Sequence, residues 1–247
     1  MMSLATKYDR WHADVLKSDP VHADETSPWY RLVLEYIKDI AGMRVLEVAC
    51  GRGGFSRLLA RRGAVVCGAD FSGAAIRAAS GKAATDVPSG IHVNFIQADA
   101  QSLPFTEEAF DVVVSCETIE HLPNPQASLA EMARVCRPGG RLYLTTPNYA
   151  NATGLYYLYA RGRKPKATPG GDQPFDRVFL FPQIRKMIRQ AGWDIIQTDG
   201  TVHQFPVWPG RNPVRAPFFE SSRTIRRTLS PVALHYFVMA QKASDRR

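Results

Sequence analysis

The stretch V-L-E-V-A-C-G-R-G-G, residues 45–54, decides the fold of this chain. Its apolar run carries one acid, breaks into glycines and resumes at helical spacing with Phe55, Leu58 and Leu59. This pattern predicts a strand that turns sharply into a helix, as in α/β domains that hold a nucleotide on the turn. Dehydrogenases and ordinary tight turns share such loops, so the stretch by itself does not identify the ligand.

Three further motifs follow in order. They are G-A-D-F-S (68–72), Q-A-D-A-Q-S-L-P-F (97–105) and F-D-V-V-V-S-C-E-T-I-E-H-L-P-N-P (110–125), which leads to R-P-G-G-R-L-Y-L-T-T-P-N (137–148). Across about residues 43–147 the series resembles the class I S-adenosylmethionine-dependent methyltransferases. In its motifs the chain is most similar to ubiquinone-pathway O-methyltransferases of the methyltransferase type 11 and 12 families. Ala49 stands where this family usually has glycine, and because alanine is small we expect little effect.

Length and composition favour one large globular domain. The chain has 247 residues, of which 45% are hydrophobic, enough for a full core. Neither a bilayer-spanning apolar run nor a secretory signal is visible, which favours a cytoplasmic location. The cysteines form no C-x-x-C pair, and we expect buried free thiols at Cys50, Cys67, Cys116 and Cys136.

The net charge of +8 has several explanations that the sequence leaves open. Basic residues gather at 161–166, between 211 and 227, and at 246–247. One explanation is a solvated basic surface. The others are a surface that binds an anionic membrane or an acidic substrate, and a surface that binds nucleic acid. Charge alone does not decide the substrate.

Strands alternate with helices along the chain. We expect strands at 43–49, 64–69, 91–96, 111–116, 140–146, 193–197 and 234–240, and helices at about 54–62, 72–81, 126–136 and 182–191. This alternation predicts an α/β, Rossmann-like fold with a seven-stranded, mostly parallel sheet and helices on both faces. The resemblance implies that the last strand lies antiparallel between its neighbours.

We expect residues 1–247 to form a single methyltransferase domain. Residues 1–42 are expected to be a helical lid, and residues 43–147 the cofactor-binding core. The segments 148–174 and 200–230 fall outside the strand–helix alternation and are expected to be insertions that cover the acceptor. We expect an apolar acceptor pocket walled by Tyr156, Tyr157, Phe205 and Trp208.

The resemblance implies S-adenosyl-L-methionine as the cofactor and places its methionine portion on the first loop. The turn from Ala49 through Gly51 and Gly53 would lie against that portion. Glu47 would orient the ammonium group of the cofactor through water. Arg31 is a further candidate for its carboxylate.

The remaining cofactor contacts are implied at the ends of later strands. Asp70 would accept hydrogen bonds from both ribose hydroxyls, and Phe71 would lie against the adenine. Asp99 suits the adenine amino group, the Ala100 amide suits a ring nitrogen, and Cys116 would contact the cofactor through its backbone. The alternative for Asp70 and Asp99 is helix capping after a strand.

The pentad Glu117-Thr118-Ile119-Glu120-His121 carries the candidate chemistry. If the chain turns helical after Cys116, then Glu117, Glu120 and His121 share one helix face. They could hold a divalent ion such as Mg²⁺, as the similarity to ubiquinone-pathway and small-RNA 2′-O-methyltransferases implies. Alternatively His121 is a general base, with Glu117 beside it, or the pentad only caps the next loop.

One difference from the relatives that use a metal favours His121 as a general base. Those relatives usually offer a further histidine before the penultimate helix, where this chain has Asp176. Asp176 could replace that histidine as an oxygen ligand for magnesium, or the metal site is lost. We favour His121 as a base by a narrow margin.

The other candidate residues lie outside these motifs. Tyr8 and Trp11 are similar to aromatic residues that close over the cofactor, although packing explains Trp11 equally well. His203 has no clear place in the predicted fold. We expect structural or solvated roles for His12, His22, His92 and His235.

These observations predict an S-adenosylmethionine-dependent methyltransferase that acts on oxygen of a small aromatic, quinone-like or lipid-linked acceptor. The expected partner is this small molecule, with peripheral membrane contact left open and nucleic acid not expected. The alternatives are a metal-dependent RNA 2′-O-methyltransferase and a non-catalytic protein that binds S-adenosylmethionine. The sequence does not predict the oligomeric state or the identity of the acceptor.

Overall fold

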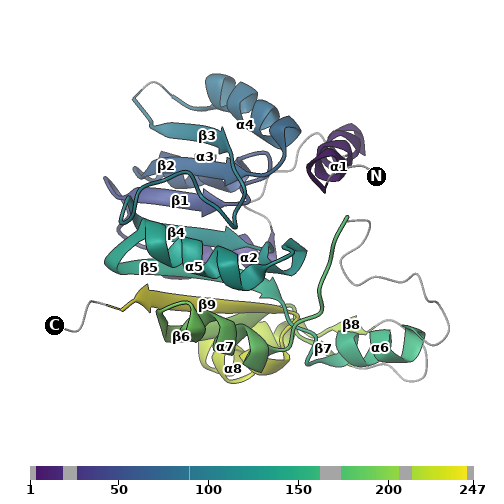
Figure 1. The fold of residues 1–247 in the computed structure, drawn as a ribbon. Coiled ribbons are helices and arrows are strands. Elements are labelled where there is room, and N and C mark those ends of the chain that lie inside the picture. The colour runs from purple at the N-terminus through teal and green to yellow at the C-terminus, as the bar shows by residue number, and fades with distance from the viewer. Residues whose placement is uncertain (1–3, 19–26, 89, 162–173, 206–212, 244–247) are drawn as a thin grey trace.

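The computed structural model describes residues 4–18, 27–88, 90–161, 174–205 and 213–243. Its main strands are β1 (Arg44–Val48), β2 (Val65–Asp70), β3 (Val93–Gln97), β4 (Phe110–Cys116), β5 (Cys136–Pro147), β6 (Trp193–Thr201) and β9 (His235–Lys242). They form one seven-stranded sheet in the order β3-β2-β1-β4-β5-β9-β6 (Figure 1). Neighbours pair in parallel except β9, which is antiparallel to β5 and β6. The predicted fold class and the antiparallel last strand are confirmed.

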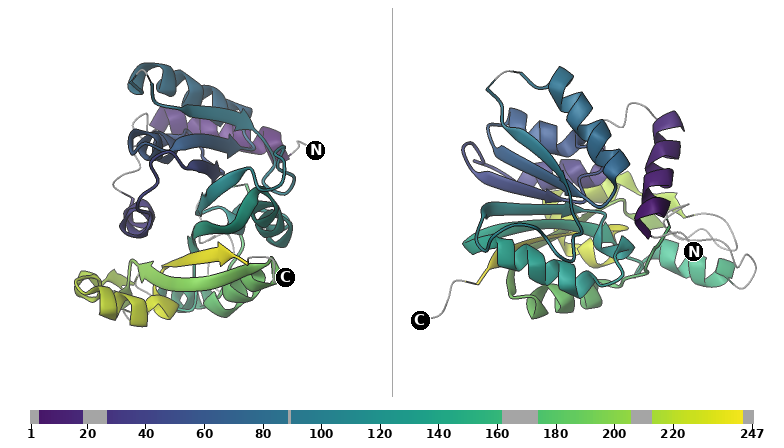
Figure 2. Two further views of the ribbon diagram at one scale, coloured as in Figure 1. Left: turned by 90° about the vertical axis from the view of Figure 1, so that its left-hand side faces the viewer. Right: turned by 45° about the horizontal axis from the view of Figure 1, so that its top comes forward.

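Helices cover both faces of this sheet (Figure 2). They are α1 (Leu4–Ser18), α2 (Pro28–Tyr36), α3 (Gly54–Arg61), α4 (Gly73–Asp86), α5 (Pro125–Val135), α6 (Ala152–Arg161), α7 (Phe181–Gln190) and α8 (Arg223–Thr228). Leu129 of α5 and Ile184 of α7 belong to the buried cluster on one face. Leu32 of α2 and Leu59 of α3 belong to the cluster on the other face. The sheet is thus the middle of three layers.

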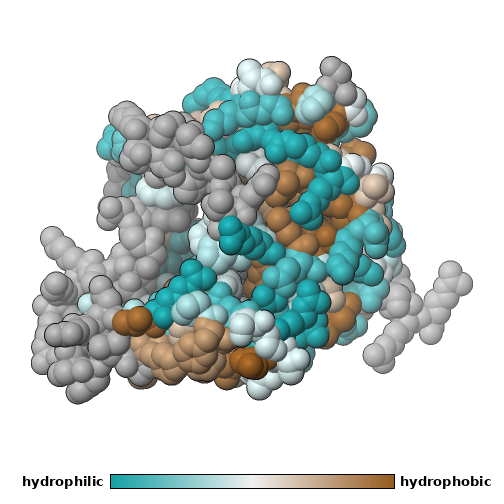
Figure 3. Space-filling view, turned by 180° about the vertical axis from the view of Figure 1, so that it is seen from behind, coloured by the Kyte–Doolittle hydropathy of each residue, from teal (hydrophilic) through white to brown (hydrophobic). Residues whose placement is uncertain are grey.

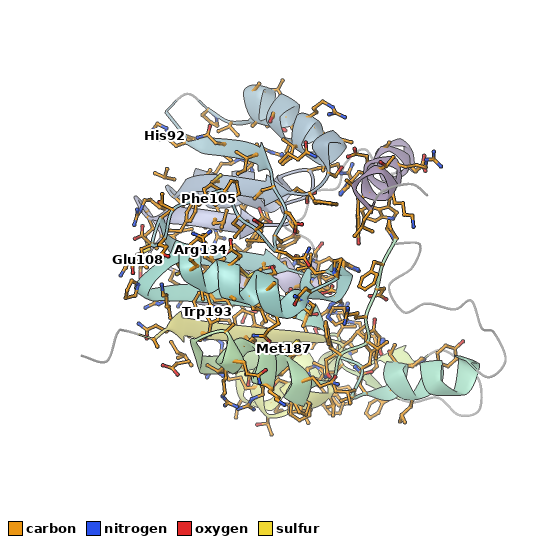
Figure 4. The ribbon with its side chains drawn as sticks, in the orientation of Figure 1. His92, Phe105, Glu108, Arg134, Met187 and Trp193 are labelled. Atoms are coloured by element: carbon orange, nitrogen blue, oxygen red, sulfur yellow. The ribbon has the colours of Figure 1, made fainter. Side chains whose placement is uncertain are left out.

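The strands at the centre are buried because both of their faces are covered. Val112, Val113 and Val114 of β4 are each at most 3% exposed. Burying a side chain of this size stabilises the fold by roughly 1.5–3 kcal/mol. Trp193 is the first residue of β6 and follows α7, the helix that carries Met187 (Figure 4). The indole Nε1 of Trp193 donates a hydrogen bond of 3.2 Å to the Leu129 carbonyl.

Arg134 fixes the loop that leads into β4. It lies near the end of α5, beside Phe105 and Glu108 (Figure 4). Its guanidinium donates to the carbonyl oxygens of Phe105 at 2.8 Å and Leu103 at 2.9 Å, and it pairs with Glu131. This loop therefore has a defined position relative to the helix that covers the sheet.

The carboxyl ends of the parallel strands meet at one edge of the sheet. The chain adds β2 and β3 on one side of β1 and then returns to add β4 and β5 on the other. Ligands of open α/β sheets bind in the crevice where the strand order reverses in this way. The fold therefore places a binding site beyond the ends of β1, β2 and β4.

The two N-terminal helices occupy different positions. Helix α1 packs against α4 beside this edge (Figure 1), whereas α2 buries Leu32 and Val33 in the core. Asp9 of α1 accepts hydrogen bonds from the Ser72 hydroxyl at 2.6 Å and the Ala74 amide at 3.1 Å. Only α1 has the position of a lid, and that role stays a prediction.

The segments outside the strand–helix alternation contain short elements. The segment 148–174 contains α6. In the segment 200–230, β7 (Gln204–Phe205) and β8 (Val214–Arg215) form a small hairpin. Short helical turns at Pro217–Glu220 and Ser230–Val232 then flank α8. Apolar side chains reach the surface here and elsewhere, as the brown areas of Figure 3 show. Among the described residues, no helix has both the length and the apolar character needed to cross a bilayer.

Candidate functional site

A cavity opens at the carboxyl edge of β1, β2 and β4. Helices α1 and α2 contribute Tyr8, Trp11, His12, Trp29 and Tyr30 to its wall. The sheet edge and its loops contribute the rest of the lining, which includes Ala49, Gly51, Arg52, Asp70, Phe71, Asp99, Ala100, Gln101, Cys116, Glu117, Thr118 and His121. The cavity therefore unites four sequence motifs that are far apart along the chain.

The first loop reaches the cavity through left-handed backbone conformations. The φ angles are 58° at Ala49, 53° at Gly51 and 70° at Gly53. Gly53 must lack a Cβ, which would lie 2.4 Å from the ring of Phe95. We expected little effect of alanine at position 49 because of its size, but its backbone conformation disfavours any residue with a Cβ by roughly 1–2 kcal/mol.

Asp70 joins the first loop to the second. Its carboxylate accepts hydrogen bonds of 2.8 Å from the amides of Gly51 and Ser72. An ionised carboxylate has about four acceptor positions, so two backbone bonds leave capacity for a ligand. Capping and ligand binding, which the sequence offered as alternatives, are compatible at this residue.

Asp99 holds the third loop at the cavity wall. Its carboxylate accepts hydrogen bonds from the backbone amide of Gln101 at 2.8 Å and from the Gln101 side chain at 3.0 Å. Phe71, Ala100 and Cys116 line the same cavity. The structure thus brings together residues that the sequence assigned to one ligand.

Three residues with expected cofactor contacts do not line the cavity. Glu47 is 1% exposed and accepts a hydrogen bond from the Ser56 hydroxyl behind the loop. Gly53 lies at the start of α3, and Arg31 is on the exposed side of α2. The contact between Arg31 and the cofactor is therefore not supported. Arg52 and His12, to which we assigned no cofactor role, line the cavity instead.

The pentad does not form the expected helical face. Glu117 has a left-handed φ of 49°, and only Ile119–His121 form a short 3-10 turn. The Glu117 carboxylate lies 2.8 Å from Nδ1 of His235. The expected helical spacing is therefore wrong at Glu117, and His235, for which we expected a structural or solvated role, is its partner.

Glu120 is buried inside the protein. It is 1% exposed, and Oε2 accepts a hydrogen bond of 2.8 Å from the Thr146 hydroxyl. Burial, and then the nearby charges of Glu117 and Asp176, raise the pKa of Glu120 well above its ordinary value. Glu120 is thus held in its protonated form over a wider pH range than a free glutamate.

His121 has a defined tautomer. Its Nδ1 lies 2.8 Å from the Phe175 carbonyl oxygen, which can only accept, so Nδ1 carries a hydrogen. In the neutral ring, Nε2 then holds the lone pair, 3.5 Å from Glu120 Oε1. Asp176 Oδ1 is 3.8 Å from Nδ1. The ring is oriented so that Nε2 can accept a proton.

Tyr8 lies over this histidine. Its hydroxyl donates a hydrogen bond of 3.4 Å to the His121 carbonyl oxygen. Burial raises the pKa of Tyr8, as do the charges of Glu120, Asp176 and Asp70. The phenol therefore stays protonated and acts as a donor in the cavity.

A metal site is not found at the pentad. Within the described ranges, no group of three His, Cys, Asp or Glu side chains is arranged to hold an ion. The expected set of Glu117, Glu120 and His121 is not such a group, and one oxygen of each glutamate is already bonded, Glu117 Oε2 to His235 and Glu120 Oε2 to Thr146. These residues do not fit a bound Mg²⁺.

Two of the four residues expected to wall the acceptor pocket do not line the cavity, and the side chains of the other two lie outside the described part of the chain. Phe205 is 45% exposed and packs against Phe218 and Phe219, and neither Phe205 nor Tyr156 lines the cavity. The Tyr157 side chain and Trp208 lie outside the described residues. Trp29 and Tyr30 of α2 are aromatic residues that do line the cavity.

Sequence comparisons match this chain to methyltransferases. Residues 46–144 match the family Methyltransf_11, a methyltransferase domain. The chain is 31% identical to the ubiquinone biosynthesis O-methyltransferase of Hahella chejuensis, over 78% of this chain and 80% of that protein. It is 32% identical to the enzyme of the same name from Neisseria meningitidis serogroup A, over 70% of this chain and 74% of that protein.

Solved structures share the fold at lower identity. A methyltransferase in complex with the Haloferax volcanii Trm112 methyltransferase activator is 19% identical, with a TM-score of 0.68 over 99% of this chain and 100% of that one. An S-adenosylmethionine-dependent methyltransferase of Methanosarcina mazei is 20% identical, with a TM-score of 0.62 over 87% and 98%. These similarities concern the fold alone.

Proposed function

Because this chain belongs to the class I S-adenosylmethionine-dependent methyltransferases, we propose that it methylates an oxygen of a small aromatic, quinone-like or lipid-linked acceptor. S-adenosylmethionine supplies a methyl group on a sulfonium, which an acceptor oxygen can displace. The observation that carries the proposal is the shared cavity: Asp70 and Asp99 line it together with Glu117 and His121. Residues for holding a nucleoside and for receiving a proton thus face the same space.

The cavity residues fit the cofactor in chemical type. Asp70 would accept the ribose hydroxyls with its remaining acceptor capacity, and Asp99 would accept from the adenine amino group. Phe71 offers an apolar surface for the base, and the amides of the first loop lie where the methionine portion would be held. Helix α1 would close over the bound molecule.

His121 would be the general base. Its Nδ1 hydrogen is fixed by the Phe175 carbonyl, so Nε2 is left to take the proton of the acceptor hydroxyl. Glu117 would accept a hydrogen bond from a neighbouring donor of the acceptor at the same end of the cavity. This proton transfer requires no metal ion, and the described residues form no group of three side chains that could hold one.

The described residues do not favour either of the two alternative functions. A non-catalytic protein that binds S-adenosylmethionine would have no use for an oriented base such as His121. A metal-dependent RNA methyltransferase would need the metal group that the described residues do not form. A cytoplasmic enzyme that meets a membrane only at its surface would have access to a lipid-linked acceptor.

Transfer of a labelled methyl group tests the proposal. The protein is incubated with S-adenosylmethionine labelled in its methyl group and with separate fractions of lipids, small metabolites and RNA. We expect label in the lipid or small-metabolite fraction and its release by ether cleavage but not by ester hydrolysis. Label confined to RNA, or absence of label together with tight cofactor binding, would contradict the proposal.

A further inference from the structure

The first residue of β9 lies at the edge of the cavity although it is far from the motifs in sequence. Because β9 runs antiparallel, its beginning lies at the edge where β4 and β5 end. His235 opens this strand and pairs with Pro147 of β5 on one side and Thr201 of β6 on the other. Its backbone is therefore fixed by both neighbouring strands.

The His235 side chain contacts two residues of the cavity wall. Its Nδ1 lies 2.8 Å from Glu117 Oε2, and its ring packs against Trp29 with centroids 4.8 Å apart. A carboxylate only accepts hydrogen bonds, so Nδ1 carries the hydrogen of this contact. Glu117 and Trp29 line the cavity, and His235 supports both from behind.

Glu117 itself is held in an unusual state. Its φ of 49° is left-handed, and its amide donates to the Thr145 carbonyl at 2.9 Å. Oε2 is bonded to His235, whereas Oε1 is buried and has no hydrogen-bond partner among the described residues. Strained backbone and an unsatisfied buried acceptor are unfavourable, and such features concentrate at sites that bind a ligand.

We propose that His235 is a positioning residue that fixes Glu117 so that its second carboxylate oxygen accepts a hydrogen bond from a second polar hydrogen of the acceptor, beside the hydroxyl whose proton His121 takes. This inference rests on the proposed methyl transfer. A hydrogen-bond acceptor at this point selects acceptors that carry a second hydrogen-bond donor next to the methylated oxygen. An acceptor without that donor would leave Oε1 unsatisfied and bind less tightly.

Two substitutions of His235 distinguish positioning from packing. In His235→Asn the side-chain amide can donate from about the place of Nδ1, whereas His235→Leu retains bulk without a donor. With a simple catechol as the acceptor probe, we expect His235→Leu to lower kcat/KM by roughly 10- to 100-fold and His235→Asn to recover most of it. The affinity for S-adenosylhomocysteine should stay within about twofold in both variants. His92→Leu, at the exposed amino end of β3 (Figure 4), is the matched control.

A double variant tests whether His235 acts through Glu117. In a Glu117→Gln background, His235→Leu should cause little further loss, because the group that it positions is already altered. Equal losses in both backgrounds would overturn the proposal. So would parallel losses of cofactor affinity and thermal stability in His235→Leu, which indicate packing alone.

Nitrogen-15 spectra of the histidine rings separate this inference from the proposed function. We expect the Nδ1–H tautomer of His235 in the wild type and its loss in Glu117→Ala, whether or not catechol is methylated. If that tautomer is present but His235→Leu retains full kcat/KM, positioning is wrong and methyl transfer stands. If the wild type methylates no hydroxyl acceptor, the proposed function fails and the inference fails with it.

Discussion

The carboxylate of Asp9 accepts a hydrogen bond of 2.6 Å from the hydroxyl of Ser72, which joins helix α1 to the start of α4 beside the cavity. Hydrogen bonds from Ser72 and Ala74 lower the pKa of Asp9, so the contact is made by a charged carboxylate near neutral pH. The same helix contributes Tyr8, Trp11 and His12 to the cavity wall. One side chain thus connects the predicted lid with the strand–helix turn that follows Asp70.

Removing this contact is expected to loosen the lid. In Asp9→Ala, S-adenosylhomocysteine should dissociate faster by on the order of tenfold, because a charge-assisted hydrogen bond that holds α1 closed is lost. Stopped-flow displacement measures this rate. Lys7→Ala, on the exposed side of the same helix, is the control and should leave the rate unchanged. Identical rates in wild type and Asp9→Ala would mean that α1 does not retain the cofactor.

Asp70 should carry a large part of the cofactor affinity. We expect Asp70→Ala to weaken binding of S-adenosylhomocysteine by about 1–3 kcal/mol, because the ribose hydroxyls and the Gly51 amide lose their acceptor. Titration calorimetry measures the loss, and a thermal melt shows whether the fold persists. Unchanged affinity in a folded variant would leave Asp70 with the capping role alone.

The left-handed conformation of Ala49 predicts that glycine at this position stabilises the fold. Ala49→Gly should raise the free energy of unfolding by about 1 kcal/mol, because relief of the left-handed strain outweighs the greater freedom of glycine in the unfolded chain. Urea denaturation provides the measurement. Ala100→Gly, a cavity residue without a positive φ, should instead lose stability. A loss at both positions would show that the backbone strain at Ala49 is negligible.

The buried Glu120 predicts a pH dependence of stability. Its raised pKa means that the folded state binds more protons than the unfolded state once the pH exceeds about 4.3, the ordinary value for glutamate. Stability then falls as pH rises, by at most about 1.4 kcal/mol per pH unit for this group. Glu120→Gln mimics the protonated form and should gain stability relative to wild type with increasing pH. A difference that is constant with pH would contradict the burial argument.

Local patterns predicted most of the fold and the cofactor side of the site. Continuous apolar segments alternate along the chain with segments of helical spacing, which is typical of a parallel sheet covered by helices on both faces. The motifs follow the ends of these strands. The resemblance of these motifs to those of methyltransferases then assigned Asp70 and Asp99 to one site. The position of the antiparallel β9 came from resemblance, since no local pattern specifies sheet order.

The acid–base end of the site could not be predicted in the same way. The spacing of Glu117, Glu120 and His121 is typical of a helix, but no glycine marks the left-handed turn that Glu117 makes. Its partner His235 is 118 residues further along the chain and arrives only through the pairing of β9. Contacts of this kind depend on tertiary structure, which explains why the metal hypothesis was attractive from sequence and fails in the fold.

The central claim is that this cavity holds the cofactor at Asp70 and Asp99 and passes the acceptor proton to His121 without a metal. The most direct measurement is methyl transfer from labelled S-adenosylmethionine to a catechol, with and without a chelator, by the wild type and His121→Ala. We expect no effect of the chelator and a loss of about 10²–10⁴-fold in His121→Ala, with S-adenosylhomocysteine affinity retained. Activity that vanishes with chelator and returns with magnesium, or full activity in His121→Ala, would contradict the account.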